Sequence, residues 1–202
     1  FIIFISAIIV IFYRIPSLRD YGVTLFAGAG VLAAIIGFAS QSAFANIIGG
    51  IFIVIYKPFR VGDIISVTTN AGRVEDITLR HTVIRNFENR RIIIPNNKIS
   101  DETIINSSIV EELVCMFFEI GISYDSDTDL AMKIIEEEAL AHPLTIDNRT
   151  DEEKEEGHPV VMVRVIGFGD SSVNLRGYVW APTPPDGFIL KCDLNESVKK
   201  RF

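Results

Sequence analysis

Alternating carboxylates at residues 125–129 have the spacing in this sequence that most resembles a chemical site. They imitate the start of a calcium-binding loop, in which oxygen ligands alternate along the chain. Such a loop needs glycine at its sixth position, but Leu130 stands there, and the twelfth position, Glu136, falls in a predicted helix. A helix start capped by Ser126 or Asp127 explains the acids better, because carboxylates are stabilised at the positive end of the helix dipole. The sequence therefore predicts no calcium site.

The other residue types that carry chemistry do not form a site either. They are three histidines and two cysteines: His81, His142, His158, Cys115 and Cys192. Their spacings match neither a metal site nor a redox pair, so we expect reduced thiols in the core. Residues 167–169, Gly-Phe-Gly, lack the third glycine and the following helix of a nucleotide fingerprint and predict a bend between strands. With no nucleophile, base and orienting group to assemble, the sequence predicts no enzyme activity, cofactor or metal.

Hydropathy divides the chain into two unlike parts. Mean hydropathy is +0.33 and 49% of residues are hydrophobic, yet 22% are charged. Residues 1–56 carry only three of the charged side chains. The remainder has ordinary soluble composition, with balanced charge over 57–112 and an acidic excess over 113–202, which predicts two soluble domains. The net charge of −7 and the lack of basic runs with interleaved aromatic residues argue against a nucleic-acid partner.

The uncharged run at residues 21–56 predicts a membrane helix that bends. Its 36 residues would form a helix of about 54 Å, too long for a hydrocarbon core of roughly 30 Å. Polar residues cluster where a helix of about 30 Å would reach the far interface. They are Ser40, Gln41, Ser42 and Asn46. We expect the bend there, with Gln41 and Asn46 facing water or another subunit's backbone, because unpartnered polar groups are costly in lipid.

Residues 1–20 predict the end of a preceding membrane helix followed by a loop. The apolar stretch at 1–13 is too short to span a bilayer, and it lacks the basic leader and cleavage site of a signal peptide. We interpret it as a truncated transmembrane helix. Pro16 bars helix continuation, so residues 14–20 are expected to be a loop between two antiparallel helices.

Small residues are dense in the long apolar run. Of the 24 residues from 27 to 50, 14 are Gly, Ala or Ser, and many recur four apart, as in Ala29, Ala33 and Gly37. Small residues at this spacing let helix backbones approach closely in lipid. The partners could be other spans of the same subunit or, because small residues lie on several faces, copies of this helix around a pore axis.

Beyond the polar cluster, apolar residues recur at helical spacing. They are Phe44, Ile47, Ile48, Ile51 and Ile55. Such a stripe is typical of a helix that lies along the membrane surface, although burial in a core would give the same pattern. We therefore expect a membrane-embedded half at residues 22–40 and an interfacial half at residues 43–56.

The soluble part predicts a small antiparallel β domain at 57–112 and an α/β domain at 113–202. In the first, runs rich in Val, Ile and Thr alternate with turn residues. The expected strands are 64–69, 73–78, 82–87 and 91–94, with turns at 70–72 and 88–89. In the second, the expected order is strand 114–124, helix 127–141, strand 160–168, strand 173–180 and helix 188–202. This order predicts a split, ferredoxin-like lobe in which the acidic segment 147–156 is a solvated loop.

Several motifs together resemble the small-conductance mechanosensitive channel (MscS) family. The resemblance runs from residue 22 to about residue 202. The motifs that carry it are Gln41, Asn46 and Gly50, then residues 57–63 (Lys-Pro-Phe-Arg-Val-Gly-Asp), 72–74, 93–96, 105–106, 124–127 and 179–180. These separate motifs occur in the same order as in the family.

The resemblance implies a fold and a function. It implies a homo-oligomeric ring, a heptamer, in which the helix at 21–56 kinks and lines the pore. Residues 57–112 would form a small Sm-like β domain and 113–202 a ferredoxin-like α/β domain, both in a cytoplasmic vestibule with side portals. The protein would be multi-pass in the cell (inner) membrane, in contact with the lipid bilayer. Membrane tension would open the pore and release ions and small solutes on hypo-osmotic shock.

Two features of the family's pore differ here. The family closes its pore with two leucine rings one turn apart, and the resemblance places Ala34 and Phe38 at those positions. Because Ala34 is too small for that role, we hypothesise that Phe38 forms the main hydrophobic constriction, which stays closed by dewetting. The family's kink glycine corresponds to Ser42. The expected hinge residues are Gln41, Ser42, Asn46, Gly49 and Gly50.

Packing between neighbouring pore helices should differ as well. The family packs alanines against glycines, and the corresponding residues are Ala27, Val31 and Ile35 against Gly30, Ala33 and Gly37. Because valine and isoleucine are larger than alanine, the helices are expected to sit farther apart or to rotate.

Two other function classes use similar parts. A membrane-tethered scaffold or ligand-binding module without conduction would need the same β and α/β domains. A secondary transporter with a broken helix would show inverted repeats and ionisable residues in mid-membrane. Residues 21–56 contain no Asp, Glu, Lys, Arg or His. Tension-gated currents would separate the channel from the scaffold.

Overall fold

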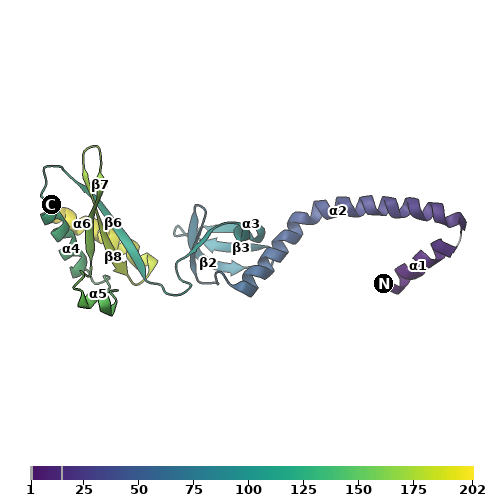
Figure 1. The fold of residues 1–202 in the computed structure, drawn as a ribbon, viewed down its shortest axis with the longest axis horizontal. Coiled ribbons are helices and arrows are strands. Elements are labelled where there is room, and N and C mark those ends of the chain that lie inside the picture. The colour runs from purple at the N-terminus through teal and green to yellow at the C-terminus, as the bar shows by residue number, and fades with distance from the viewer. Residues whose placement is uncertain (1, 15) are drawn as a thin grey trace. The chain divides into compact units, whose positions relative to one another are not determined.

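The structure is a computed structural model that describes residues 2–14 and 16–202. These residues form six α-helices and eight β-strands, most of which are labelled in Figure 1. They divide into two compact units, one of residues 1–61 and 67–104 and one of residues 62–66 and 105–202. Phe1 and Ile15, which we expected in the truncated helix and in the loop, lie outside the described residues.

Two helices, α1 (Ile2–Arg14) and α2 (Pro16–Tyr56), make up the apolar part of the first unit. Because α2 already begins at Pro16, the expectation of a loop over residues 14–20 is wrong. Proline is tolerated at the first helical position, since the N–H that it lacks would have no intrahelical partner there. A Cβ added at the buried Gly22 would lie 3.2 Å from Cδ1 of Phe12. The two helices therefore pack together near their connection.

By length and composition, one helix among the described residues is suited to cross a bilayer. It covers Thr24–Tyr56, 33 residues with a mean hydropathy of 1.8, and no part of its most apolar 18-residue window is buried. The apolar part of α1, Ile3–Phe12, is shorter. Figure 1 shows α2 as one long helix that bends along its course.

The strands before residue 107 form one five-stranded sheet of order β4-β3-β2-β1-β5. They are β1 (Ile64–Val67), β2 (Asn70–Ile77), β3 (His81–Arg85), β4 (Arg91–Pro95) and β5 (Ile104–Asn106), with α3 (Asn96–Asp101) after β4. β3 pairs antiparallel with both β2 and β4. The turn expected at 70–72 is wrong, since β2 begins at Asn70 and the turn lies at Thr68 and Thr69. Thr68 takes the positive φ, 55°, that such a tight turn needs, without the usual glycine.

The second unit contains a three-stranded antiparallel sheet of order β6-β8-β7. Its elements are β6 (Val114–Ile122), α4 (Thr128–Ala141), α5 (Asp151–Glu155), β7 (Met162–Phe168), β8 (Val173–Ala181) and α6 (Pro184–Arg201). Apart from α5, this is the order expected from the sequence. The acidic segment is not all loop, because α5 forms within it. Thr150 Oγ1 accepts the N–H of Glu153, and the Glu153 carboxylate accepts the N–H of Thr150, a reciprocal cap that stabilises so short a helix.

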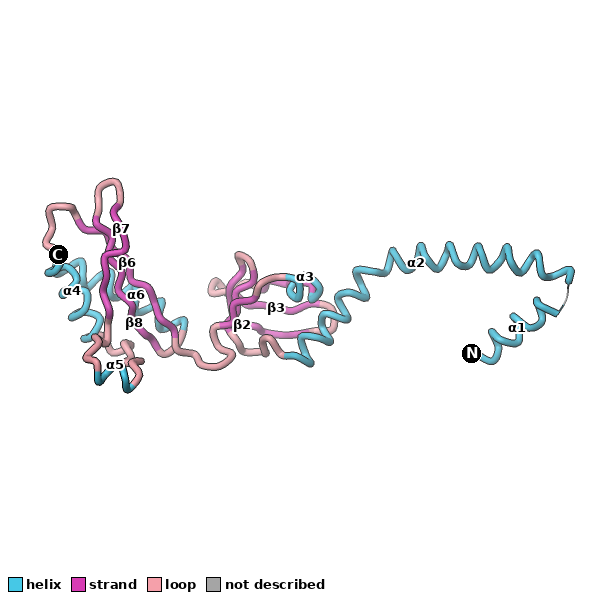
Figure 2. The backbone as a smooth tube through the Cα atoms, viewed as in Figure 1, coloured by secondary structure: helices cyan, strands magenta, loops and turns pink. Residues whose placement is uncertain are grey.

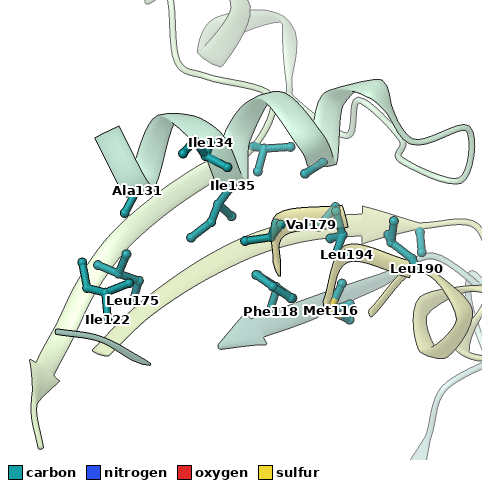
Figure 3. Packing of buried hydrophobic residues seen from close by; sticks show 14 of the residues in the cluster. Met116, Phe118, Ile122, Ala131, Ile134, Ile135, Leu175, Val179, Leu190 and Leu194 are labelled. Carbon is teal, nitrogen blue, oxygen red and sulfur yellow. The ribbon is translucent and has the colours of Figure 1, made fainter. Parts of the chain in front are cut away.

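Helices α4 and α6 cover one face of this sheet and enclose the core of the unit. Figure 3 shows side chains of both helices pointing at those of β6 and β8. Along β8 every second residue is buried, among them Leu175 and Val179, and the register places Met116 opposite Val179 on the same face. The alternate residues point away from the core. The other face of the sheet is therefore not covered by these helices.

Two sequence expectations about single residues have opposite outcomes. Asp127 caps α4, because its Oδ1 accepts the N–H of Leu130 at 3.0 Å, so the helix start is confirmed. The expectation of two core thiols is wrong. Cys192 is exposed on α6, and Cys115 is only half-buried, on the uncovered face of β6.

Candidate functional site

The first half of α2 exposes large apolar side chains. Phe38 is 78% exposed, and Val31 and Ile35 are each more than half exposed. Burying such a side chain is worth about 1.5–3 kcal/mol relative to leaving it in water. Several of them on one helix therefore call for cover by lipid or by another protein surface.

One face of α2 is hollowed. The hollow, of about 560 Å³, is lined by this helix alone, through Ala34, Gly37, Phe38, Gln41, Phe44, Ala45 and Ile48. Two of the lining residues are phenylalanines. Figure 2 shows that α2 curves along its length. Ala34, Phe38 and Gln41 therefore share one face of the helix, as their spacing of four and three residues requires.

The polar cluster of α2 does not interrupt the helix. Gln41 and Ser42 remain helical and their side chains are exposed. Asn46 Nδ2 donates to the carbonyl oxygen of Ser42 at 2.8 Å, one turn earlier. Such side-chain bonds to a helical carbonyl are one way in which a helix is weakened locally. A hinge at these residues stays a prediction.

Three glycines of α2 have no neighbour in the described chain that requires them. A Cβ added at Gly28, Gly30 or Gly37 would meet no heavy atom within 4 Å. Glycine in a helix interior costs about 1 kcal/mol relative to alanine, so its use here needs a reason outside the single chain. The close approach of another helix backbone is such a reason in lipid.

Gly49 and Gly50 differ from these three, because the end of α2 packs tightly against other elements. Both are buried. A Cβ at Gly50 would lie 2.5 Å from Asn96 Nδ2 and from the carbonyl oxygen of Leu79, and one at Gly49 would lie 3.0 Å from the carbonyl oxygen of Asn96. Ile53, three residues further along α2, is only 3% exposed. Only glycine lets α2 approach α3 and the β2–β3 turn this closely.

Hydrogen bonds reinforce this packing. Asn46 Oδ1 accepts the N–H of Asn97 at 3.1 Å. That N–H lies in the first turn of α3, where helical N–H groups lack intrahelical partners, and the N-cap residue of α3, Pro95, offers no side-chain bond. Asn46 of α2 therefore supplies the bond that α3 cannot make itself.

A buried pair holds the other side of the contact. Thr82 and Asn96 are both 0% exposed. Thr82 Oγ1 donates to Asn96 Oδ1 at 2.9 Å, and Asn96 Nδ2 donates to the carbonyl oxygen of Thr78 at 2.9 Å. Both ends of the Asn96 amide are thus satisfied, as buried polar groups require. We call these residues the junction: Asn46, Gly49, Gly50, Thr78, Leu79, Thr82, Asn96 and Asn97.

Replacing Thr82 should destabilise the junction. Thr82→Val keeps the shape of the side chain but leaves the buried Asn96 Oδ1 without its donor, so we expect the free energy of unfolding to fall by about 1–3 kcal/mol. Thermal unfolding of the purified protein in detergent measures this. Ser100→Ala is the matched control, because Ser100 is exposed and its Oγ bonds only to the carbonyl oxygen of Asn96. Equal losses for the two variants would contradict the assigned role of Thr82.

The structure separates the five expected hinge residues into two groups. Asn46, Gly49 and Gly50 lie in the junction, whereas Gln41 and Ser42 lie on the exposed part of α2. Sequence reasoning missed Thr82 and Leu79, whose types are ordinary in a strand and a turn. Asn96 could have been found from the sequence, since it belongs to the motif at residues 93–96 that supports the family resemblance.

Two family models match the chain. Residues 42–109 match the mechanosensitive ion channel β-domain, and residues 117–202 match the C-terminal domain of the mechanosensitive ion channel MscS. The chain belongs to the MscS family. The β-domain match begins inside α2, so the MscS β-domain region includes the end of the helix that carries the junction.

Individual MscS relatives cover nearly the whole chain. An uncharacterized MscS family protein of Archaeoglobus fulgidus is 35% identical over 201 residues, which are 98% of this chain and 66% of that protein. The small-conductance mechanosensitive channel of Helicobacter pylori is 29% identical over 199 residues, 95% of this chain and 67% of that protein. The crystal structure of Helicobacter pylori MscS in its closed state matches with a TM-score of 0.75 and 26% identity, over 88% of this chain and 66% of that one. The chain thus spans about two thirds of the length of these proteins.

Proposed function

We propose that this chain forms the pore-lining and cytoplasmic parts of an MscS-type channel that membrane tension opens, releasing ions and small solutes on hypo-osmotic shock. The observation that carries the proposal is the single face of α2 on which Ala34, Phe38 and Gln41 lie beside an unfilled hollow. The names of the relatives as mechanosensitive channels support conduction over a scaffold without a pore.

The proposed assembly is a homo-oligomeric ring, a heptamer. Its helix contacts would place Ala27, Val31 and Ile35 of one copy against Gly30, Ala33 and Gly37 of the next. Two observations support this arrangement. Val31 and Ile35 are exposed in the single chain, and a Cβ added at Gly30 or Gly37 would meet no atom of the described residues within 4 Å. The glycines leave room for the side chains of a neighbouring helix, and the larger knobs at Val31 and Ile35 would set the helices farther apart than alanines would.

The proposed gate is a ring of Phe38 side chains. An apolar constriction excludes ions by excluding water, without a physical plug. Ala34, one turn earlier on the same face, is too small to add a second ring. Tension favours the state with the larger in-plane area, while helix packing and the dry Phe38 ring favour the closed one.

In the proposed mechanism the two halves of α2 have different tasks. The second half is fixed to the β domain by Gly50 and Asn46, so a change of angle between the halves falls at Gln41 and Ser42, where α2 has no such support. The protein would lie in the cell (inner) membrane as a multi-pass protein, with the β and α/β domains in the cytoplasm.

Patch recording tests the proposal directly. The full-length protein is reconstituted in liposomes, and excised patches are recorded under graded suction, with empty liposomes as the control. We expect single-channel currents that appear above a tension threshold. Silence up to lytic tension would reject the channel and favour the membrane-tethered scaffold or ligand-binding module.

A further inference from the structure

The uncovered face of the β6-β8-β7 sheet carries a group of aromatic side chains. Tyr178 and Trp180 of β8 alternate with the buried Val179, so they point away from the core. Phe117 of β6 lies opposite Tyr178 in the register, and their rings meet edge to face at 5.1 Å. This face therefore offers aromatic rings to whatever lies against it.

A pocket of about 420 Å³ opens on this face, entirely within the second unit. Trp180, Tyr178, Met162 and Cys115 line its floor, and the segment of residues 148–160, which includes α5, forms its wall. Burial raises the pKa of the Cys115 thiol. The floor is thus formed mainly by aromatic and sulfur-containing side chains.

One carboxylate of the wall, that of Glu153, accepts a backbone N–H and makes no hydrogen bond to a cation of the described residues. Arg149 binds Asp147 through two hydrogen bonds of 2.8 Å and donates a third, of 2.7 Å, to the carbonyl oxygen of His158. This guanidinium holds the pKa of Asp147 well below its ordinary value, so both groups stay charged and neutralise each other. Glu153 is the carboxylate among the described residues that line the pocket; it lies within electrostatic reach of Arg149, whose hydrogen bonds go to Asp147 and to the carbonyl oxygen of His158.

The position of Glu153 is distinctive within its helix. It is half-buried toward the pocket, whereas its neighbours Glu152 and Lys154 are exposed. Its Oε2 accepts the N–H of Thr150 at 2.8 Å, which fixes the carboxylate in place. A charge held at the edge of an aromatic pocket attracts a ligand of opposite sign.

The same sheet face already holds one cation over its rings. Arg176 Cζ lies 4.8 Å from the centroid of the Phe117 ring and 6.0 Å from that of Tyr178. Both distances are within the range in which a cation is attracted by a ring face. Trp180, the better cation binder among aromatic residues, lines the pocket together with Tyr178.

We propose that this pocket binds a small organic cation of the quaternary ammonium class. Trp180 and Tyr178 contact its methyl groups, and Glu153 supplies the opposite charge. A quaternary ammonium fits better than a primary amine, because it has no N–H donors that would need acceptors on the floor formed by Met162 and Cys115. An anion is disfavoured, since the one arginine of the wall is already occupied by Asp147.

Choline and its neutral isostere, 3,3-dimethyl-1-butanol, test the proposal with the full-length protein in detergent. Trp180 is the single tryptophan of residues 1–202, so the part of the fluorescence change that Trp180→Phe removes reports on the pocket. We expect choline to change the fluorescence saturably, with an affinity at least about tenfold higher than that of the isostere. No saturable change with choline, or equal affinity for both compounds, would overturn the proposal.

Variants separate the charge from the shape of the pocket. Glu153→Gln keeps the cap of α5, because glutamine also serves at that position, and should weaken choline binding about tenfold. Glu152→Gln, one residue away and exposed, should leave binding unchanged. Choline binding to Trp180→Phe and Trp180→Leu is measured by calorimetry. The Phe variant should lose less affinity than the Leu variant, because phenylalanine keeps an aromatic ring. Unchanged binding in Glu153→Gln would contradict the role of the carboxylate, while the proposed conduction would stand or fall separately on the patch recordings.

Discussion

Phe38→Ser channels are expected to open at a much lower membrane tension than the wild type. Serine would hydrate the proposed constriction, so the proposed dry state that blocks ions would lose its apolar lining. Keeping one such side chain out of water is worth on the order of 2 kcal/mol. Because each copy in the ring contributes one Phe38, the substitution removes this amount from the closed state once per copy. Excised patches under graded suction give the threshold, expressed relative to a co-reconstituted channel of a different type.

Phe38→Leu is the matched control for this experiment. Leucine keeps an apolar ring, so its threshold should stay close to that of the wild type. A Ser variant with an unchanged threshold would remove Phe38 from the gate. A Leu variant that opens as easily as the Ser variant would indicate that the ring acts through its size rather than through dewetting.

Gly50→Ala is expected to loosen the end of α2 from the β domain. The new Cβ would lie 2.5 Å from Asn96 Nδ2 and from the carbonyl oxygen of Leu79, and neither can yield without breaking the junction. Overpacking of this kind costs about 1–3 kcal/mol, which corresponds to a fall in Tm of roughly 2–4 °C for each kcal/mol in a protein of this size. Thermal unfolding and amide hydrogen exchange over residues 46–56 measure the loss.

Gly28→Ala provides the comparison for Gly50→Ala. The same substitution in the same helix meets no atom within 4 Å, and alanine is the better helix former by about 1 kcal/mol. Protection of residues 46–56 against hydrogen exchange should therefore stay the same in Gly28→Ala, whatever this substitution does to contacts between copies of the chain. If both variants lower this protection equally, the close approach at Gly50 does not hold the helix to the β domain.

The sequence predicted the elements of the second unit well, because their patterns are local. The alternation along β8 and the cap at Asp127 are each read from a few neighbouring residues. Errors arose where one residue type permits two structures. Pro16 can end a helix or begin one, and Thr68 takes a turn conformation that usually signals itself through glycine.

The junction could be predicted only in part, since its contacts join residues far apart in sequence. Gly49 and Gly50 lie in a run of small residues in which Gly30 and Gly37 look alike. In the folded chain, Asn96 and Leu79 lie close to Gly49 and Gly50 but not to Gly30 and Gly37. Periodicity identifies which residues share a face of a helix, but not which distant segment covers that face.

The hydrogen bond between Asn46 and Asn97 also has a consequence for biosynthesis. The two residues are 51 positions apart, and at roughly 5–20 residues per second the ribosome needs about 3–10 s to add that length. Throughout that interval Asn46 has been synthesised, but Asn97 has not. The bond between the end of α2 and α3 can therefore form only after the strands β1 to β4 between them have been made.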